Sequence, residues 1–236
     1  MIEHPKGNFF FDTGLGTNID LQISNNLSFF ARSVVKYKKL TTVKRELSEN
    51  GLLSNSIDFI IPSHYHWDHV SALSDFPNTN VWITPSEDNY IFSSEAKAPN
   101  FIKEQYNSKT TKWKTIKFNP IPYEVFTESL DIFNDGSLIL VPVSGHTEGS
   151  VGLFANLKSG KRYFFTGDVT WDVKAFQRPS EKHIIPRKQV DHNTELIENT
   201  IDKTHNLMQQ NPSLIIVPAH DYQVQQRIAQ FPKREN

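Results

Sequence analysis

Residues His64 to His69 read His-Tyr-His-Trp-Asp-His and gather three imidazoles and one carboxylate within six positions. They directly follow the apolar run Phe59–Ile61, which we expect to be the end of a buried strand. Imidazole nitrogen suits zinc and iron, whereas carboxylate oxygen suits harder cations, so the mixture predicts a transition-metal site. The alternative is a polar surface turn that happens to be rich in His.

Three further donors stand in a similar setting. His146, Asp168 and His220 each follow a small residue (Gly145, Gly167 and Ala219) shortly after another apolar run. Strand ends converge on one rim of a layered sheet, so donors that are distant in sequence can meet there. A lone His at a strand end is usually structural, but three donors placed like the His-rich turn favour one shared metal site.

Elements that position these donors can be read from hydrophobic periodicity and turn residues. Strands are predicted at 8–11, 57–61, 81–83, 131–133, 138–141, 151–155, 162–166 and 214–217. Helices are predicted at 36–50 and 191–210, with short ones after the His-rich turn and near the C-terminus. Segment 85–128 is aromatic, loop-prone and less regular, and is either a substrate-facing insertion or ordinary surface packing. We treat residues 1–236 as a single domain.

Composition excludes several classes of protein. The formal charge is −1, from 25 basic and 26 acidic side chains, so no nucleic-acid partner is expected. The chain is 37% hydrophobic with 17 Phe, which is not a disordered composition, and no apolar run approaches the roughly 20 residues needed to span a bilayer. There is no Cys, which excludes disulfides, Cys-ligated zinc and a thiol nucleophile and leaves nine His for metal binding.

At this point the sequence resembles the metallo-β-lactamase superfamily of metallo-hydrolases. The resemblance covers nearly the whole chain through five motifs in the family's order: Asp12-Thr13-Gly14, His64-x-His66-x-Asp68-His69, Gly145-His146-Thr147, Gly167-Asp168 and Ala219-His220-Asp221. It implies an α/β (α+β) fold, a four-layer αββα sandwich. It also implies two divalent metal ions, for which zinc is expected and manganese, iron and cobalt are alternatives. On this resemblance His64, His66 and His146 hold the first metal, Asp68, His69 and His220 hold the second, and Asp168 bridges both.

The resemblance also implies a mechanism. Two cations would lower the pKa of a shared water, so that a metal-bridging hydroxide attacks a carbonyl or phosphoryl group. Asp68 or Asp168 would be the catalytic acid that carries the proton to the leaving group. Asp12 either holds a ligand His in its tautomer or forms the turn with Gly14, and Asp221 either orients a ligand or caps the helix that follows.

Within the superfamily the ligands narrow the choice of function. A flavodiiron-type oxidase would have Glu in place of His66, β-lactamases proper generally lack the bridging Asp168, and a tRNA-processing nuclease would carry a more basic surface. Overall the chain looks most like the N-acyl-homoserine lactonase-like branch, which predicts hydrolysis of lactones or carboxylic esters. Phosphodiester hydrolysis on the same fold is the alternative, and a non-catalytic metal-binding protein is a further one.

One position departs from that branch. Those lactonases commonly place a Tyr three residues after the bridging Asp, where its hydroxyl supports the developing oxyanion, and here that position is Trp171. Trp171 is either a weaker donor or a hydrophobic wall, and Tyr222 or Tyr90 are candidates to supply the missing hydroxyl.

The start of the chain is a second departure. Family domains usually open with a strand or two before the Asp-Thr-Gly strand, so we expect this chain either to lack an N-terminal segment or to be a short member. It shows no signal-peptide pattern, which favours the cytoplasm, with a periplasmic or secreted location open if a leader was removed. The expected partner is a small-molecule substrate, without nucleic acid or membrane.

Overall fold

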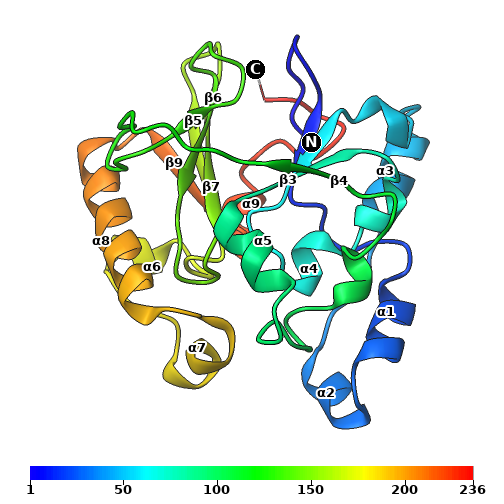
Figure 1. Ribbon diagram of the computed structural model, residues 1–236. Helices are drawn as coiled ribbons and strands as arrows, with labels where there is room; N and C mark the ends of the chain where they lie inside the picture. Colours follow the sequence, from blue (N-terminus) through cyan, green and yellow to red (C-terminus); the bar gives the residue numbers. More distant parts are fainter. Residues whose placement is uncertain (236) are drawn as a thin grey trace. The chain divides into compact units, whose positions relative to one another are not determined.

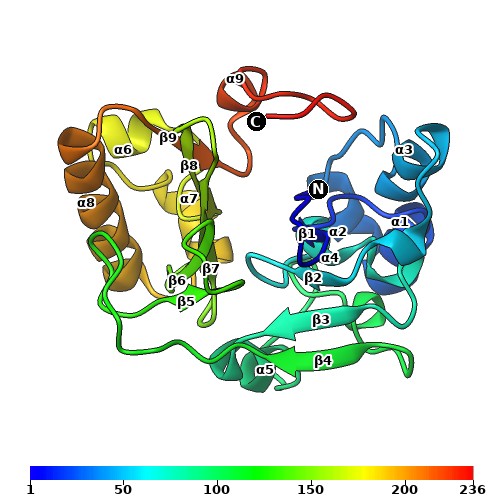
Figure 2. The same ribbon diagram turned by 90° about the horizontal axis from the view of Figure 1, so that it is seen from above.

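The structure is a computed structural model that describes residues 1–235. The chain divides into two compact units, Met1–Ile116 and Lys117–Asn236. Each unit contains one β-sheet with helices packed beside it (Figures 1 and 2). Each unit carries its own set of candidate ligands.

The sheet of the first unit has four parallel strands in the order β1-β2-β3-β4. The strands are β1 (Phe9–Phe11), β2 (Phe59–Ile61), β3 (Asn80–Ile83) and β4 (Lys112–Thr115). β2 lies between β1 and β3 and is buried throughout, which explains why its sequence is a continuous apolar run. Because the strands are parallel, the chain leaves β1 and β2 at the same edge, where Asp12 N donates to Ile61 O at 3.1 Å. This edge carries the His-rich turn.

Short helices connect these strands. They are α1 (Ile19–Asn26), α2 (Phe29–Val34), α3 (Val43–Glu49), α4 (Trp67–Val70) and α5 (Pro85–Ile91), with single 3-10 turns η1 (Ser54–Ser56), η2 (Leu73–Asp75) and η3 (Lys103–Gln105). The helix predicted over 36–50 begins only at Val43, because Thr42 Oγ1 accepts the backbone N–H of Arg45 and caps it there. α5 and β4 make segment 85–128 more regular than its composition predicts.

The sheet of the second unit has five strands in the order β5-β6-β7-β8-β9. They are β5 (Leu130–Asp131), β6 (Leu138–Pro142), β7 (Val151–Asn156), β8 (Arg162–Gly167) and β9 (Leu214–Pro218), and only the β8–β9 pair is parallel. Phe154 and Phe164 face each other on β7 and β8, with ring centroids 4.0 Å apart. Asp168 follows β8 and His220 follows β9, and the parallel pairing brings these two strand ends to the same edge.

Helices of the second unit are α6 (Lys174–Gln177), α7 (Ile184–Val190), α8 (Thr194–Gln210) and α9 (Tyr222–Gln225). α8 runs along one face of this sheet beside α6 (Figure 2), and Ile197, Ile201 and Leu207 on its buried side join the core of β6 to β9. Asn193 caps α8 by accepting the backbone N–H of Leu196. Of the helices in residues 1–235, none is long and apolar enough to cross a membrane.

Candidate metal centre

The His-rich turn lies between β2 and α4 in the first unit. His66 occupies the residue before the first turn of α4, in extended backbone, and Asp68 and His69 lie within that turn. The rings of His64 and His66 have centroids 4.6 Å apart, and those of His64 and His69 are 4.0 Å apart. His69 Nε2 lies 3.7 Å from Asp68 Oδ2. The turn therefore gathers all four of its predicted donors, with the three imidazoles buried.

Asp12 and Ser63 hold two of these imidazoles in place. His69 Nδ1 lies 3.0 Å from Asp12 Oδ2, and Ser63 Oγ lies 2.9 Å from the same oxygen and 3.0 Å from His64 Nδ1. A carboxylate only accepts, which assigns the Ser63 hydroxyl proton to Asp12 and the Nδ1 protons to His64 and His69. Nε2 of both rings then carries the lone pair, as metal coordination requires.

Asp12 also has the backbone of a turn residue, with φ of 59°. Its Oδ1 accepts the backbone N–H of Ser63 at 2.6 Å, and the neighbouring Thr13 donates from both N and Oγ1 to the carbonyl of His69. Asp12 therefore has the backbone of a turn residue and also contacts His69, and its role in orienting metal ligands stays a prediction.

Asp12→Ala is expected to lower the affinity of the protein for Zn²⁺ by about 10- to 100-fold, because His69 loses its Nδ1 acceptor and Ser63, which pairs with His64, loses the acceptor of its hydroxyl proton. Competition with a chromogenic chelator measures this affinity. Glu49→Ala, which removes an exposed carboxylate paired with Arg45, is the matched control and is expected to leave it unchanged. Equal affinities for the two variants would show that the turn positions its imidazoles without Asp12.

Segment 85–128 packs against the same turn. The ring of Phe101 lies 4.7 Å from that of His66, and Tyr90 lies 5.4 Å from Phe101. Trp67 N donates to Asn100 O at 2.9 Å. Phe101 is buried, so this part of the segment supports a ligand imidazole as core packing does. Its role in contacting substrate stays a prediction.

The second unit brings together its three predicted donors. Asp168 Oδ2 lies 3.1 Å from His220 Nε2 and 3.6 Å from His146 Nε2. His146 and Asp168 are buried, whereas the side chain of His220 is 43% exposed. One carboxylate oxygen between two imidazole nitrogens is the arrangement expected of donors gathered at a metal centre.

A buried ion pair lies behind His146. Asp191 Oδ1 is 2.6 Å from His146 Nδ1, and Lys182 Nζ is 2.5 Å from the same oxygen. Burial lowers the pKa of His146, and the charge of Lys182 lowers it further, against the opposing effect of Asp191. The neutral imidazole that results is the form that ligates metal. Burial also lowers the pKa of Lys182, while the charge of Asp191 opposes this.

Other predicted residues of the second unit have less direct roles. Asp221 caps α9 by accepting the backbone N–H of Val224 at 3.0 Å, and it also accepts Val173 N at 2.8 Å. Trp171 is 37% exposed, with Lys182 Nζ 5.6 Å from its ring centroid. Tyr222 is 71% exposed at the start of α9. Their contacts with substrate stay predictions.

Ser63, Lys182 and Asp191 are functional candidates that sequence reasoning missed. Ser63 precedes the His-rich turn, where a hydroxyl beside a His is a usable signal. Lys182 and Asp191 lie in segments with neither a strand pattern nor a metal motif. They are nine residues apart, and nothing in the sequence indicates that their side chains pair.

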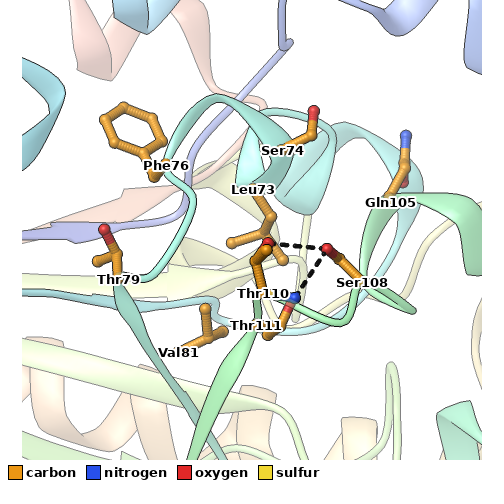
Figure 3. A pocket seen from close by; sticks show the side chains of 9 residues that line it. All are labelled: Leu73, Ser74, Phe76, Thr79, Val81, Gln105, Ser108, Thr110 and Thr111. Atoms are coloured by element: carbon orange, nitrogen blue, oxygen red, sulfur yellow. Dashed lines mark hydrogen bonds between the residues drawn. The ribbon is translucent and has the colours of Figure 1, made fainter.

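A small cavity in the first unit is a less suitable site (Figure 3). Its lining residues are Leu73, Ser74, Phe76, Thr79, Val81, Gln105, Ser108, Thr110 and Thr111. Ser108 Oγ and Thr110 Oγ1 are hydrogen-bonded to each other at 2.9 Å, so two polar groups of the lining already have a partner within the cavity wall. None of these nine residues is charged or a usual metal ligand, which separates the cavity from the chemistry described above.

The donor chemistry fits a divalent metal. All seven predicted ligands belong to groups of His and Asp side chains that could hold an ion. Nitrogen and carboxylate oxygen donors without sulfur suit Zn²⁺, Mn²⁺, Fe²⁺ or Co²⁺. In both units a carboxylate faces Nδ1 of a candidate ligand, partly buried Asp12 in the first and buried Asp191 in the second, and such a contact is the usual support of a metal-binding His.

Comparison with known proteins decides the family. The model of the metallo-beta-lactamase superfamily matches residues 1–220. The chain belongs to this superfamily. Its predicted fold is thereby confirmed as a metallo-β-lactamase fold, and the chain is a hydrolytic enzyme of a superfamily that binds divalent metal ions.

Relatives of this metallo-hydrolase include lactonases. A probable metallo-hydrolase of Mycobacterium tuberculosis is 24% identical over 94% of the chain and 73% of its own length. The N-acyl homoserine lactonase AttM of Rhizobium radiobacter is 26% identical over half of the chain and 45% of its own length. Among solved structures, an N-acyl homoserine lactone hydrolase with the product N-hexanoyl-L-homoserine at its catalytic metal centre aligns with a TM-score of 0.72. That alignment covers 98% of this chain and 83% of the other at 18% identity.

Proposed function

We propose that this metallo-hydrolase is a dinuclear enzyme that hydrolyses lactones or carboxylic esters, with zinc as the expected cation. The observation that carries the proposal is that each unit holds His and Asp donors side by side, with a further carboxylate, partly buried Asp12 or buried Asp191, facing Nδ1 of a donor imidazole. In this proposal His64, His66 and His146 hold one cation and Asp68, His69 and His220 hold the other. Asp168 would be a ligand of both.

Bound cations would activate a water for attack and polarise the substrate carbonyl. The two proposed catalytic carboxylates differ in exposure, which divides their work. Asp168 is 6% exposed and lies between two imidazoles, so we assign it to metal binding. Asp68 is 24% exposed beside His69, so its carboxylate can reach solvent and carry a proton to the leaving alkoxide. Trp171, which is partly exposed after the Asp168 loop, offers an indole face or N–H to the acyl group.

Lactones are the favoured substrates because relatives whose names record that activity recur in both comparisons. A further fold relative, AidC, is described as a dizinc quorum-quenching lactonase and aligns with a TM-score of 0.60 at 18% identity. At such identities the likeness establishes fold, so the substrate class rests on the proposal and needs direct measurement.

Purified protein is expected to bind about two equivalents of Zn²⁺, and chelation is expected to abolish hydrolysis of acyl lactones and aryl esters. Metal analysis and assays before and after reconstitution measure both. His66→Ala is expected to lose metal and activity together. The matched control is His4→Ala, which changes a partly exposed His outside both ligand sets. Activity that survives chelation and His66→Ala would refute the proposal.

The substrate class is tested by comparing kcat/KM across acyl lactones, aryl esters and aryl phosphodiesters on one metal-loaded preparation. We expect the carboxylic substrates to lead. A higher kcat/KM for the phosphodiesters would assign the enzyme to the alternative class, and metal binding without turnover of any substrate would support a non-catalytic role.

A further inference from the structure

Lys182 and Asp191 form a buried pair whose side-chain contacts converge on His146. The side chains of Lys182 and Asp191 are 2% and 0% exposed. Asp191 Oδ1 is the shared acceptor, 2.6 Å from His146 Nδ1 and 2.5 Å from Lys182 Nζ, and Nζ itself lies 3.1 Å from Nδ1. Charged groups are rarely buried so fully unless they are paired, so the presence of this pair beside a candidate ligand needs an explanation.

The short contact fixes where the proton of His146 lies. An imidazole nitrogen and a carboxylate oxygen at 2.6 Å repel each other unless a proton lies between them, and the carboxylate is the acceptor. Nδ1 is therefore protonated and donates to Asp191. Lys182 then donates to Asp191 as well, because a protonated Nδ1 has no lone pair for an ammonium group. Nε2 of His146 carries the lone pair.

The pair serves little other structural purpose. Oδ2 of Asp191 is buried and accepts no hydrogen bond from any residue in the described range 1–235. The capping of α8 belongs to the neighbouring Asn193. Asp191 follows α7, and the two residues after it donate backbone hydrogen bonds to the loop of the ligand, from His192 N to His146 O and from Asn193 N to Gly145 O. The backbone thus ties Asp191 to the loop that carries His146.

We propose that Asp191 and Lys182 are positioning residues that hold His146 as the Nδ1–H tautomer, with its Nε2 directed to the metal. Asp191 accepts the hydrogen bond from Nδ1–H, and Lys182 offsets the buried charge and fixes the rotamer of Asp191. Neither touches the substrate, since both side chains are buried. The inference rests on the proposed function only insofar as His146 is a metal ligand.

A direct test reads the tautomer of His146 by ¹⁵N NMR of the histidine side chains in the full-length, chelator-treated protein. His146→Ala assigns the signals. The expected wild-type pattern is a protonated Nδ1 and an unprotonated Nε2. In Asp191→Ala the acceptor is lost and Lys182 is left to donate to Nδ1, so the signals should shift toward the Nε2–H tautomer. An Nε2–H tautomer in the wild type would overturn the proposal outright.

A second test measures Zn²⁺ affinity by competition with a chelator in a double-mutant cycle. Asp191→Ala is expected to weaken binding by about 100-fold, and Lys182→Met by about 10-fold. Lys182→Met combined with Asp191→Ala should bind more tightly than Asp191→Ala alone, because no ammonium is left to hold the wrong tautomer. If the two residues acted only through packing, the double variant would bind Zn²⁺ more weakly than Asp191→Ala, since a second truncation would weaken binding further.

The exposed pair Lys174–Asp172 of the same unit supplies matched controls. Lys174→Met and Asp172→Ala should change neither affinity nor the NMR pattern. The proposal would be overturned if Asp191→Ala changed neither the Zn²⁺ affinity nor the tautomer of His146. If the wild type binds metal but hydrolyses no substrate, the proposed function fails while the affinity cycle still decides this inference. If the wild type binds no metal, or a variant does not fold, the wild-type tautomer decides it.

Discussion

Asp168→Ala is expected to reduce kcat/KM for acyl lactones by on the order of 10³-fold, the loss expected when a two-cation site worth several kcal/mol is disrupted. The physical reason is the central place of Asp168, whose Oδ2 lies 3.1 Å from His220 Nε2 and 3.6 Å from His146 Nε2. Without this carboxylate two cations would lose their shared anionic ligand and repel each other. Steady-state kinetics and metal analysis of the same preparation measure the effect, with metal content expected to fall from about two equivalents toward one or fewer.

Asp172→Ala is the matched control for this substitution. Asp172 lies four residues further on in the same loop, and its side chain is 53% exposed. We expect it to keep both metal and activity. Full activity of Asp168→Ala would exclude Asp168 from the catalytic centre, whereas lost activity with both metals retained would assign it to catalysis without metal holding.

Gly145→Ala is expected to destabilise the protein by about 3 kcal/mol. Overpacking contributes about 1–3 kcal/mol, and the positive φ, which is unfavourable for an L residue, contributes about 1–2 kcal/mol. Gly145 has φ of +134°, and an added Cβ would lie 2.7 Å from Ile197 N and 2.8 Å from Ile197 Cγ1. The methyl group would push the loop of His146 away from α8. We therefore expect weaker Zn²⁺ binding as well as a lower free energy of unfolding, measured by urea denaturation of the metal-free chain.

Gly160→Ala separates the two causes. Gly160 also has a positive φ, +86°, but an added Cβ there would meet nothing within 4 Å. It should cost only the backbone strain, about 1 kcal/mol, and leave metal binding unchanged. Equal destabilisation by the two substitutions would show that α8 moves to accommodate the added methyl group at position 145. The close packing of α8 would then not position His146.

Strand order along the sequence was predictable because buried strands leave a strong local signal. The runs at β2, β6 and β9 are continuous and apolar, and β8 has the aromatic centre Tyr163-Phe164-Phe165; each was placed within two residues of its observed bounds. Helices α1, α2, α5, α6 and α7 and strand β4 were not predicted. α1 has a weak apolar pattern and no side-chain cap, and α2 exposes Phe29 and Phe30, so periodicity gives little sign of either.

The sequence by itself determined the donors, since seven His and Asp residues stand in family order after strands or in the turn between strand and helix. It could not determine what holds them. Asp12 meets Ser63 across 51 positions and Asp191 meets His146 across 45. Such contacts depend on which strand ends share an edge and which loops fold back on them, and neither leaves a local periodicity. The choice of donors is a property of residue chemistry, whereas their tautomers and orientation were decided by tertiary packing alone.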